Sequence, residues 1–131
     1  MYQVMEFPWP VTNRDVVFHI QITHDPETKA ATIRLTAAPA YTPETDNVRM
    51  QQSTGEYVFE PAADGMVNVT WRQHAEPAGG IPQWLINAML VDIPFNSLKA
   101  LQQLAQNQPY HEAQLRYSAE SVAEAFQNKS W

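Results

Sequence analysis

Apolar and polar residues alternate in four segments within the first two thirds of this chain, and this alternation constrains the fold more than any other feature. In the first segment, Asp15–Thr23, one face of an extended chain carries Val16, Phe18, Ile20 and Ile22, and the other carries Asp15, Val17, His19 and Gln21. The other segments are Ala31–Ala37, Gln52–Glu60 and Met66–His74. Polar, turn-forming stretches connect them: His24–Thr28, Pro39–Asp46 and Pro61–Gly65. The pattern predicts antiparallel strands whose apolar face another element has to cover.

A long apolar segment follows the predicted strands. Gly79 and Gly80 interrupt the chain, Pro82 suits the first turn of a helix, and the spacing over Ile81–Gln106 is helical. The first half of this segment is apolar nearly all round, which predicts burial. Pro94 lies inside it and must kink the helix or divide it in two. We therefore predict an α+β fold in which a curved antiparallel sheet is covered by a long C-terminal helix.

A second amphipathic helix is predicted at the end of the chain. Over His111–Gln127, one face carries Leu115, Ala119, Val122 and Phe126. We expect a domain over residues 1–106 and an appended helix within 107–131.

Composition and charge exclude several classes of function. The formal net charge is −6 and the 8 Lys and Arg residues do not cluster, which disfavours nucleic acid and strong docking on anionic lipid headgroups. The chain has no cysteine, so disulfides, thiolate metal sites and a cysteine nucleophile are excluded. No signal peptide and no apolar run of the ~18 residues of a membrane span is seen. We expect a soluble, cytoplasmic protein without stable membrane insertion.

A search for catalytic and metal-binding patterns finds little. The 4 histidines lack metal-ligand spacing, and His19 and His74 are expected on the polar faces of strands as solvated surface residues. The chain contains no nucleophile elbow, P-loop or dinucleotide-binding glycine motif. Neither a metal nor a cofactor is expected.

Most acidic residues of the chain are expected in loops or on exposed strand faces, where they favour solubility. Asp92 is the exception. It lies inside the apolar helical segment, where a carboxylate should have a partner or reach water. Arg14, at the start of the first strand, is a conceivable partner. The alternative is that Asp92 lies at the helix surface near Asn96 and Lys99.

Large aromatic and methionine side chains concentrate on the predicted strands and helix. They could line a cavity, and they could equally fill an ordinary core: Phe18, Tyr57, Phe59, Trp71, Trp84 and Met89.

Three segments together resemble one known family. Pro8–Val17 is similar to the P-W-P-x-x-x-R-D-hydrophobic signature of START domains, the lipid-transfer domains related to the steroidogenic acute regulatory protein. Gly79–Asn87 resembles the family's G-x-[IL]-P-x-W-[LI]-x-N entry into the C-terminal helix. Val91–Leu101 is similar to the V-D-x-P-[YF]-x-[ST]-L-x-x-L continuation found especially in bacterial members. With shorter matches at 41–43, 48–50 and 55–57, the resemblance covers Phe7–Leu104.

The resemblance implies a helix-grip fold with an internal lipid-sized tunnel. It also implies binding or shuttling of a hydrophobic molecule such as a sterol, phospholipid, fatty acid or polyketide-like compound. Carried over by position, Arg14 and Asp15 start the strand along the tunnel, and Trp84, Leu85, Ala88, Met89 and Asp92 lie on the helix that closes it. Together with residues taken from the strand and aromatic patterns, the predicted ligand-binding residues are Arg14, Phe18, Ile20, Ile33, Tyr57, Phe59, Trp71, Trp84, Leu85, Ala88, Met89 and Asp92.

Two departures from the family pattern change what the resemblance implies. START domains are considerably longer, and the portion before Pro8 is essentially absent here, so we expect that the N-terminal part of the family domain is missing. The sheet edge left open would then favour self-association into a homo-oligomer. In addition, Ile20 stands about where some sterol-carrying members have a basic residue, which weakens the expectation of a sterol.

Two other functions stay open. An enzyme of the same superfamily could use Asp92, Arg14 and Tyr57 for acid–base chemistry on an apolar substrate. Alternatively, the apolar stripe of the last helix, within Leu115–Phe126, could make the chain a dimerisation or interaction module.

Overall fold

The computed structural model describes residues 1–108, 110 and 111. The chain forms two compact units, Met1–Gln83 and Trp84–Trp131, which are described separately below. The second amphipathic helix predicted over His111–Gln127 lies almost wholly outside the described residues, so it stays a prediction, as does the domain boundary after residue 106.

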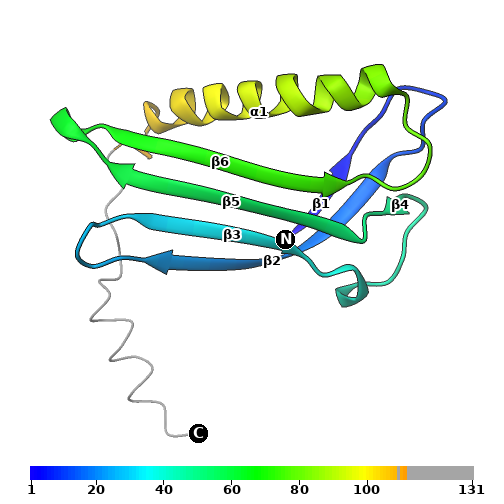
Figure 1. Cartoon of the computed structure of the whole chain (residues 1–131), viewed down its shortest axis with the longest axis horizontal. Coiled ribbons are helices and arrows are strands. Elements are labelled where there is room, and N and C mark those ends of the chain that lie inside the picture. Colours follow the sequence, from blue (N-terminus) through cyan, green and yellow to red (C-terminus); the bar gives the residue numbers. More distant parts are fainter. Residues whose placement is uncertain (109, 112–131) are drawn as a thin grey trace, which may run out of the picture. The chain divides into compact units, whose positions relative to one another are not determined.

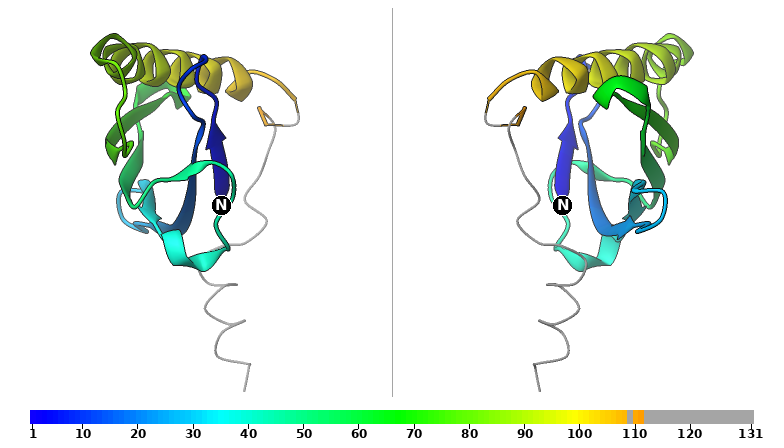
Figure 2. Two further views of the ribbon diagram at one scale, coloured as in Figure 1. Left: turned by 90° about the vertical axis from the view of Figure 1, so that its right-hand side faces the viewer. Right: turned by 90° about the vertical axis from the view of Figure 1, so that its left-hand side faces the viewer.

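The first unit is a curved antiparallel sheet (Figures 1 and 2). Its strands are β1 (Tyr2–Met5), β2 (Arg14–His24), β3 (Ala31–Ala37), β4 (Val48–Arg49), β5 (Gln52–Pro61) and β6 (Val67–Glu76). They are ordered β1-β2-β3-β5-β6, and the short β4 pairs with β2 in parallel. Two short 3-10 helices, η1 (Pro39–Tyr41) and η2 (Ala63–Gly65), lie in the connections. The four predicted strands are confirmed with ends that agree within two residues, whereas β1 and β4 were not predicted.

Strand β2 has two halves with different surroundings. Its first residues, Arg14–Phe18, are all buried, and the strand is paired there with β1 and with β4. Its last residues, His19–His24, are all exposed, and among the described residues they pair with β3. The small core lies at the buried half, where Val16, Phe18 and Met50 contact one another. The buried half of β2 is therefore the centre of the fold.

The second unit, as far as it is described, consists mainly of helix α1 (Gln83–Ala105). The helix runs without interruption through Pro94, so this proline does not divide it. The prediction that its first half is buried on all sides is wrong: among the helix residues only Leu85 is buried, and Leu90 is 70% exposed. An all-round apolar pattern indicates burial only where other elements surround the helix. Apolar side chains left exposed in this way are typical of a surface that binds something else.

Candidate functional site

The register of the strands places apolar residues in rows on one face of the sheet. Ile22 lies opposite Ile33, Ile33 opposite Tyr57, and Tyr57 opposite Trp71, so that the row crosses four strands. Residues directly opposite each other on antiparallel strands point to the same side of a sheet. With the neighbouring rows, this defines the apolar face: Phe18, Ile20, Ile22, His24, Ala31, Ile33, Leu35, Ala37, Ser53, Gly55, Tyr57, Phe59, Pro61, Val67, Val69, Trp71, Gln73 and Ala75.

Six of the predicted ligand-binding residues lie on this apolar face. They are Phe18, Ile20, Ile33, Tyr57, Phe59 and Trp71. Phe18 belongs to the core, where it is 7% exposed, whereas Ile20 is 39% exposed. The neighbouring Ile22 is 69% exposed. The structure therefore brings the predicted sheet residues together on one surface, and part of that surface is open to solvent.

Three aromatic rings form a stacked platform on the apolar face. The Tyr57 ring lies 5.1 Å from the Trp71 ring and 6.3 Å from the Phe59 ring, measured between centroids, and the planes are inclined by only 11° and 17°. Burial raises the pKa of the Tyr57 phenol, which therefore stays protonated at neutral pH. We call Tyr57, Phe59 and Trp71 the aromatic platform. It offers a broad apolar contact surface and carries two hydrogen-bonding groups, the Tyr57 hydroxyl and the Trp71 indole N–H.

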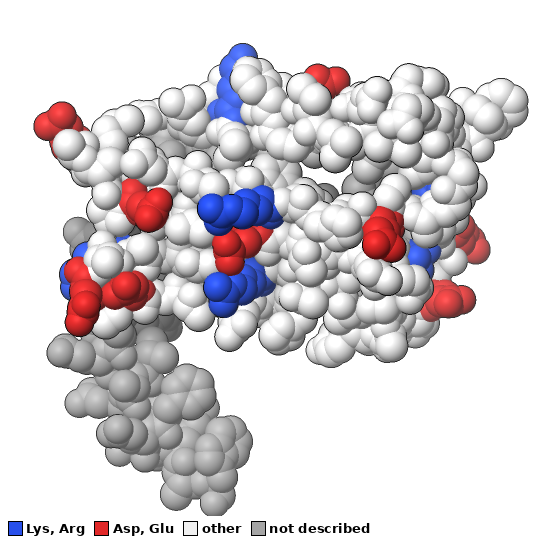
Figure 3. Space-filling view, viewed as in Figure 1, with Lys and Arg blue, Asp and Glu red and all other residues white. Residues whose placement is uncertain are grey.

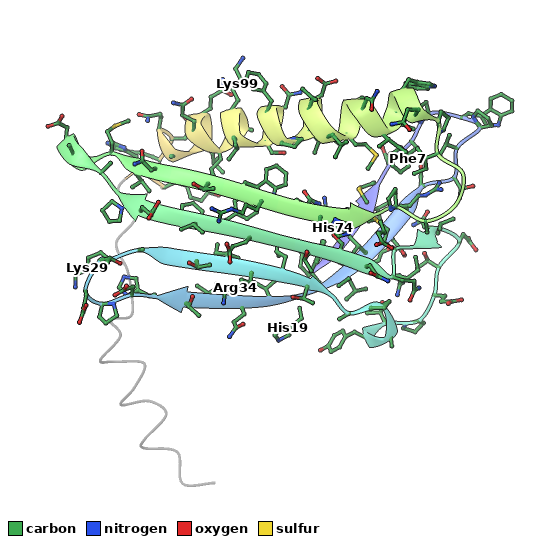
Figure 4. All side chains as sticks on the ribbon, viewed as in Figure 1. Phe7, His19, Lys29, Arg34, His74 and Lys99 are labelled. Carbon is green, nitrogen blue, oxygen red and sulfur yellow. The ribbon has the colours of Figure 1, made fainter. Side chains whose placement is uncertain are left out.

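The opposite face of the same sheet is polar. Arg34, Glu56 and Arg72 lie side by side on β3, β5 and β6, and both arginines donate to the Glu56 carboxylate over 2.9 Å and 3.2 Å (Figure 3). These bonds, the one from Arg34 foremost, lower the Glu56 pKa. Among the labelled side chains of Figure 4, Arg34, His19 and His74 belong to this face, and the surface positions predicted for the two histidines are confirmed. The charged groups thus avoid the apolar face.

A buried ion pair joins the start of β2 to β4. Asp15 is 0% exposed, and its carboxylate accepts hydrogen bonds from Arg49 Nε at 2.6 Å and Arg49 Nη2 at 3.2 Å. The hydroxyls of Thr45 and Tyr2 donate to it over 2.7 Å and 2.9 Å. These hydrogen bonds, the one from Arg49 foremost, outweigh the effect of burial and lower the pKa of Asp15 to about 2.

The position of Asp15 corrects the sequence analysis, which placed Asp15 and Val17 on a polar strand face. Both residues are buried, and on that side of β2 the side chains of Tyr2, Thr45 and Arg49 contact the Asp15 carboxylate. Sequence reasoning therefore missed the most buried charged pair of the sheet unit.

Arg49 also holds the connection between β3 and β4. Its Nη1 donates to the carbonyl oxygens of Pro39 and Thr42 over 2.7 Å and 3.2 Å, and its Nη2 donates to that of Pro43 over 3.0 Å. The hydrogen bond to Asp15 raises the Arg49 pKa, so the guanidinium stays charged. One side chain thereby fixes the path of the loop predicted over Pro39–Asp46.

Arg14 has a structural environment of the same kind. It is 3% exposed, and it donates to the carbonyl oxygens of Pro77 at 3.1 Å, Ala78 at 2.7 Å and Thr12. Its guanidinium also lies 5.6 Å from the centre of the Phe7 ring. Arg14 therefore connects the start of β2 to the segment after β6.

Comparison with known proteins identifies the family. A model of the START domain matches residues 1–110. The chain belongs to the START domain family. The family resemblance predicted from Phe7–Leu104 is thereby confirmed.

Two relatives of this START domain show how much of a longer protein it matches. An uncharacterised protein of Pseudomonas aeruginosa is 40% identical over 107 residues, which are 80% of this chain and 52% of that protein. The crystal structure of a STAR-related lipid transfer protein fragment from Xanthomonas axonopodis has a TM-score of 0.68 and 37% identity, and the match covers 81% of this chain and 59% of that one. The chain thus spans little more than half the length of either relative. The predicted fold class is confirmed: α+β of the helix-grip type, with a curved antiparallel sheet and a long C-terminal helix.

The other predicted ligand-binding residues of the START domain lie on α1. Leu85 is buried, Ala88 and Met89 are half-buried, and Trp84 and Asp92 are exposed. Leu85, Met89 and Asp92 are spaced three or four residues apart and so share one side of the helix. The hypothesis that Asp92 pairs with Arg14 stays a prediction, since the two residues lie in different units.

Two hollows of the START domain lie in its sheet unit. A hollow of about 250 Å³ is lined by Met1, Phe18, His19, Ile20, Ala38 and Tyr41. Another of about 330 Å³ is lined by Thr54, Gly55, Glu56, Arg72, Gln73 and His74. The internal tunnel implied by the resemblance stays a prediction.

Two further features concern metal sites and membranes. Within residues 1–108, 110 and 111, no group of three or more His, Asp and Glu side chains is placed to hold a metal ion. None of the helices in the described part of the chain combines the length and the apolar character needed to cross a membrane.

Proposed function

We propose that this START domain binds a hydrophobic small molecule of the lipid class on the apolar face of its sheet and carries it unchanged. The observation that supports this most directly is the row from Ile22 to Trp71, which continues into the aromatic platform. Side chains such as Ile22, at 69% exposure, leave apolar area in water that a bound molecule would cover. The similarity to a protein described as a lipid transfer protein points the same way.

The proposed contacts follow from the geometry of the sheet. Ile20, Ile33 and the aromatic platform would contact the ligand, and Phe18 would support them from the core. The α1 residues Trp84, Leu85, Ala88, Met89 and Asp92 are retained as proposed contacts on the strength of the family resemblance. Arg14 has a better supported role in holding the segment after β6, so we propose that it acts there rather than on the ligand.

Binding is favoured over catalysis by the chemistry of the apolar face. Its only acid–base candidate among the proposed residues is Tyr57, whose pKa is raised by burial, so that it is a poor base at neutral pH. The guanidinium of Arg14 is already bonded to backbone carbonyls. We therefore propose a binding protein that needs no cofactor. We also propose that it acts in the cytoplasm.

The test is native mass spectrometry of the purified protein under gentle and then denaturing conditions, with organic extraction of the same sample. We expect a discrete mass of a few hundred daltons that is lost on denaturation and recovered in the organic phase. The same spectra count the chains that hold the ligand and so test the predicted homo-oligomer.

A protein purified without ligand is tested in a second way. The uncharged apolar fluorophore N-phenyl-1-naphthylamine should bind with increased fluorescence, and added lipid should displace it. A folded protein that carries no extractable molecule and leaves this fluorophore unaffected would contradict the proposal.

A further inference from the structure

The indole nitrogen of Trp71 is a buried donor that lacks an acceptor within the part of the chain that the structure describes. Its Nε1 atom is buried and has no hydrogen-bond partner among the described residues. An indole N–H can only donate, so the missing group is an acceptor atom. Leaving such a donor unpaired in an apolar environment is unfavourable, and buried tryptophans usually find a partner. A bound molecule that brings an acceptor would satisfy it.

Tyr57 carries a second donor on the ring that stacks against Trp71. Its ring is stacked on that of Trp71 with centroids 5.1 Å apart, and the two residues are directly opposite each other on β5 and β6. A phenol hydroxyl can donate and accept, so it can share one acceptor with an indole or adapt to a second oxygen. The platform therefore combines apolar rings with two hydrogen-bonding groups on adjacent side chains.

The strands of the apolar face provide no Lys, Arg, Asp or Glu to pair with a charged ligand, and His24, opposite Ala31 at the end of β2, is the basic side chain that they place on this side. Of the four strands that build it, β2, β3, β5 and β6, every Lys, Arg, Asp and Glu between Phe18 and Glu76 has the parity of the polar face, as Arg34, Glu56 and Arg72 illustrate. An ionised group buried without a partner is strongly unfavourable. A carboxylate, phosphate or ammonium headgroup beside the platform consequently has no Lys, Arg, Asp or Glu partner on the strands of this face.

From these observations we infer that the ligand is an uncharged lipid with an oxygen acceptor, such as a ketone or ester carbonyl, and that Trp71 Nε1 and Tyr57 bind this oxygen. The inference rests on the proposed function, because it specifies the ligand class of the same apolar face. Trp71 was predicted as an apolar contact, and its role here is to select the polar group.

The test compares two ligands of equal heavy-atom number on two proteins. The affinities of 2-undecanone and dodecane are measured by displacement of N-phenyl-1-naphthylamine, for the full chain and for its Trp71→Phe variant, which keeps an aromatic ring and loses the donor. Combining both changes in one cycle cancels the difference in hydrophobicity between the ligands. We expect Trp71→Phe to weaken 2-undecanone relative to dodecane by about 3- to 10-fold, the effect of one hydrogen bond.

A matched control uses Trp9→Phe, because Trp9 is 92% exposed and lies outside the apolar face. Its cycle should give a ratio near one. Undecanoate at neutral pH should bind more weakly than 2-undecanone to the unchanged protein. In the ¹H–¹⁵N spectrum, the assigned Trp71 indole resonance should move downfield with 2-undecanone and much less with dodecane, a readout that does not require the variant to fold.

The outcomes separate the inference from the proposed function. If the fluorophore and both ligands bind but the Trp71→Phe cycle gives a ratio near one and the indole resonance does not respond to the ketone, the acceptor assignment is overturned and lipid binding stands. Tighter binding of undecanoate than of 2-undecanone overturns the uncharged ligand. A protein that binds neither the fluorophore nor any of these ligands overturns both proposals.

Discussion

The two halves of β2 differ more than any two strands of the sheet. Arg14–Phe18 is buried and holds an ion pair, a core phenylalanine and an arginine bonded to three carbonyls. His19–His24 alternates regularly between apolar and polar residues, yet every one of its side chains is exposed. The half with the cleaner amphipathic pattern is thus the less buried one. The comparison indicates that the first half stabilises the fold, whereas the exposed apolar side chains of the second half belong to the surface on which we propose that the ligand binds.

The sharpest test of the buried half is Asp15→Asn. Removing one partner from a buried ion pair leaves the other charge poorly compensated, so we expect a loss of about 3 kcal/mol in the free energy of unfolding. The loss should appear in urea denaturation and as a marked fall in melting temperature. The exposed Asp46 offers a matched control, and Asp46→Asn should change stability by less than about 0.5 kcal/mol. Equal losses of stability in the two variants would contradict the conclusion that the Asp15–Arg49 ion pair stabilises the fold.

The pH dependence of the free energy of unfolding tests the same ion pair without a substitution. The pKa of Asp15 falls from 3.8 to about 2 on folding, so the unfolded chain takes up the proton first as the pH decreases. The stabilisation is therefore present above about pH 4 and is lost as the pH falls towards 2. Urea midpoints measured between about pH 5 and pH 2 should decline more steeply in the unchanged protein than in Asp15→Asn. Parallel declines would contradict the assignment.

The exposed half should show the opposite response, with an effect on binding rather than on stability. Ile22→Thr removes apolar contact area from the apolar face, and we expect about 5-fold weaker binding of N-phenyl-1-naphthylamine with little change in the urea midpoint. The control is Val58→Thr on β5, a comparable change from a β-branched apolar residue to threonine. Val58 lies on the polar face of the sheet, so this change should leave the affinity for the fluorophore unchanged. The division of β2 would be wrong if Ile22→Thr unfolded the protein or bound as tightly as the original.

The smallest expected effect concerns the polar face. Glu56 accepts from two arginines that are largely exposed, with side-chain exposures of 58% for Arg34 and 69% for Arg72. Exposed ion pairs contribute little, so Glu56→Gln should lower stability by less than about 1 kcal/mol, and the difference should shrink in high salt. Thermal denaturation at low and high salt measures it. A loss as large as that of Asp15→Asn would show that the polar face also stabilises the fold.

Alternation was sufficient to predict β2, β3, β5 and β6, because a side-chain period of two is visible in a single sequence. It could not predict β1 or β4, which have four and two residues and so show no clear period. The distribution of aromatic side chains along the sequence identified the residues of the aromatic platform, but their stacking depends on the register between β5 and β6, which is a property of paired strands. The α1 residues illustrate the opposite failure, since an apolar pattern does not tell which neighbours surround a helix.

The ion pair was missed for a different reason. Asp15 and Arg49 are 34 positions apart, and Asp15 has the parity of the polar strand face. The only local signal was an arginine placed between Val48 and Met50, within a segment of apolar neighbours. A charged residue between two apolar neighbours is also typical of a strand with one exposed face, so this pattern neither indicates that Arg49 is buried nor identifies its partner.

The five hydrogen bonds of Arg49 have a consequence for how this sequence can diverge. All five go to fixed acceptors: two to Asp15 and one each to the carbonyl oxygens of Pro39, Thr42 and Pro43. Lysine has the same charge but three donors on a single atom, and it cannot reach acceptors arranged around a planar fork. Substitutions at Ile20 or Ile22 can therefore accumulate one at a time as the ligand changes, whereas the Asp15–Arg49 pair can be lost only together with the loop that it holds.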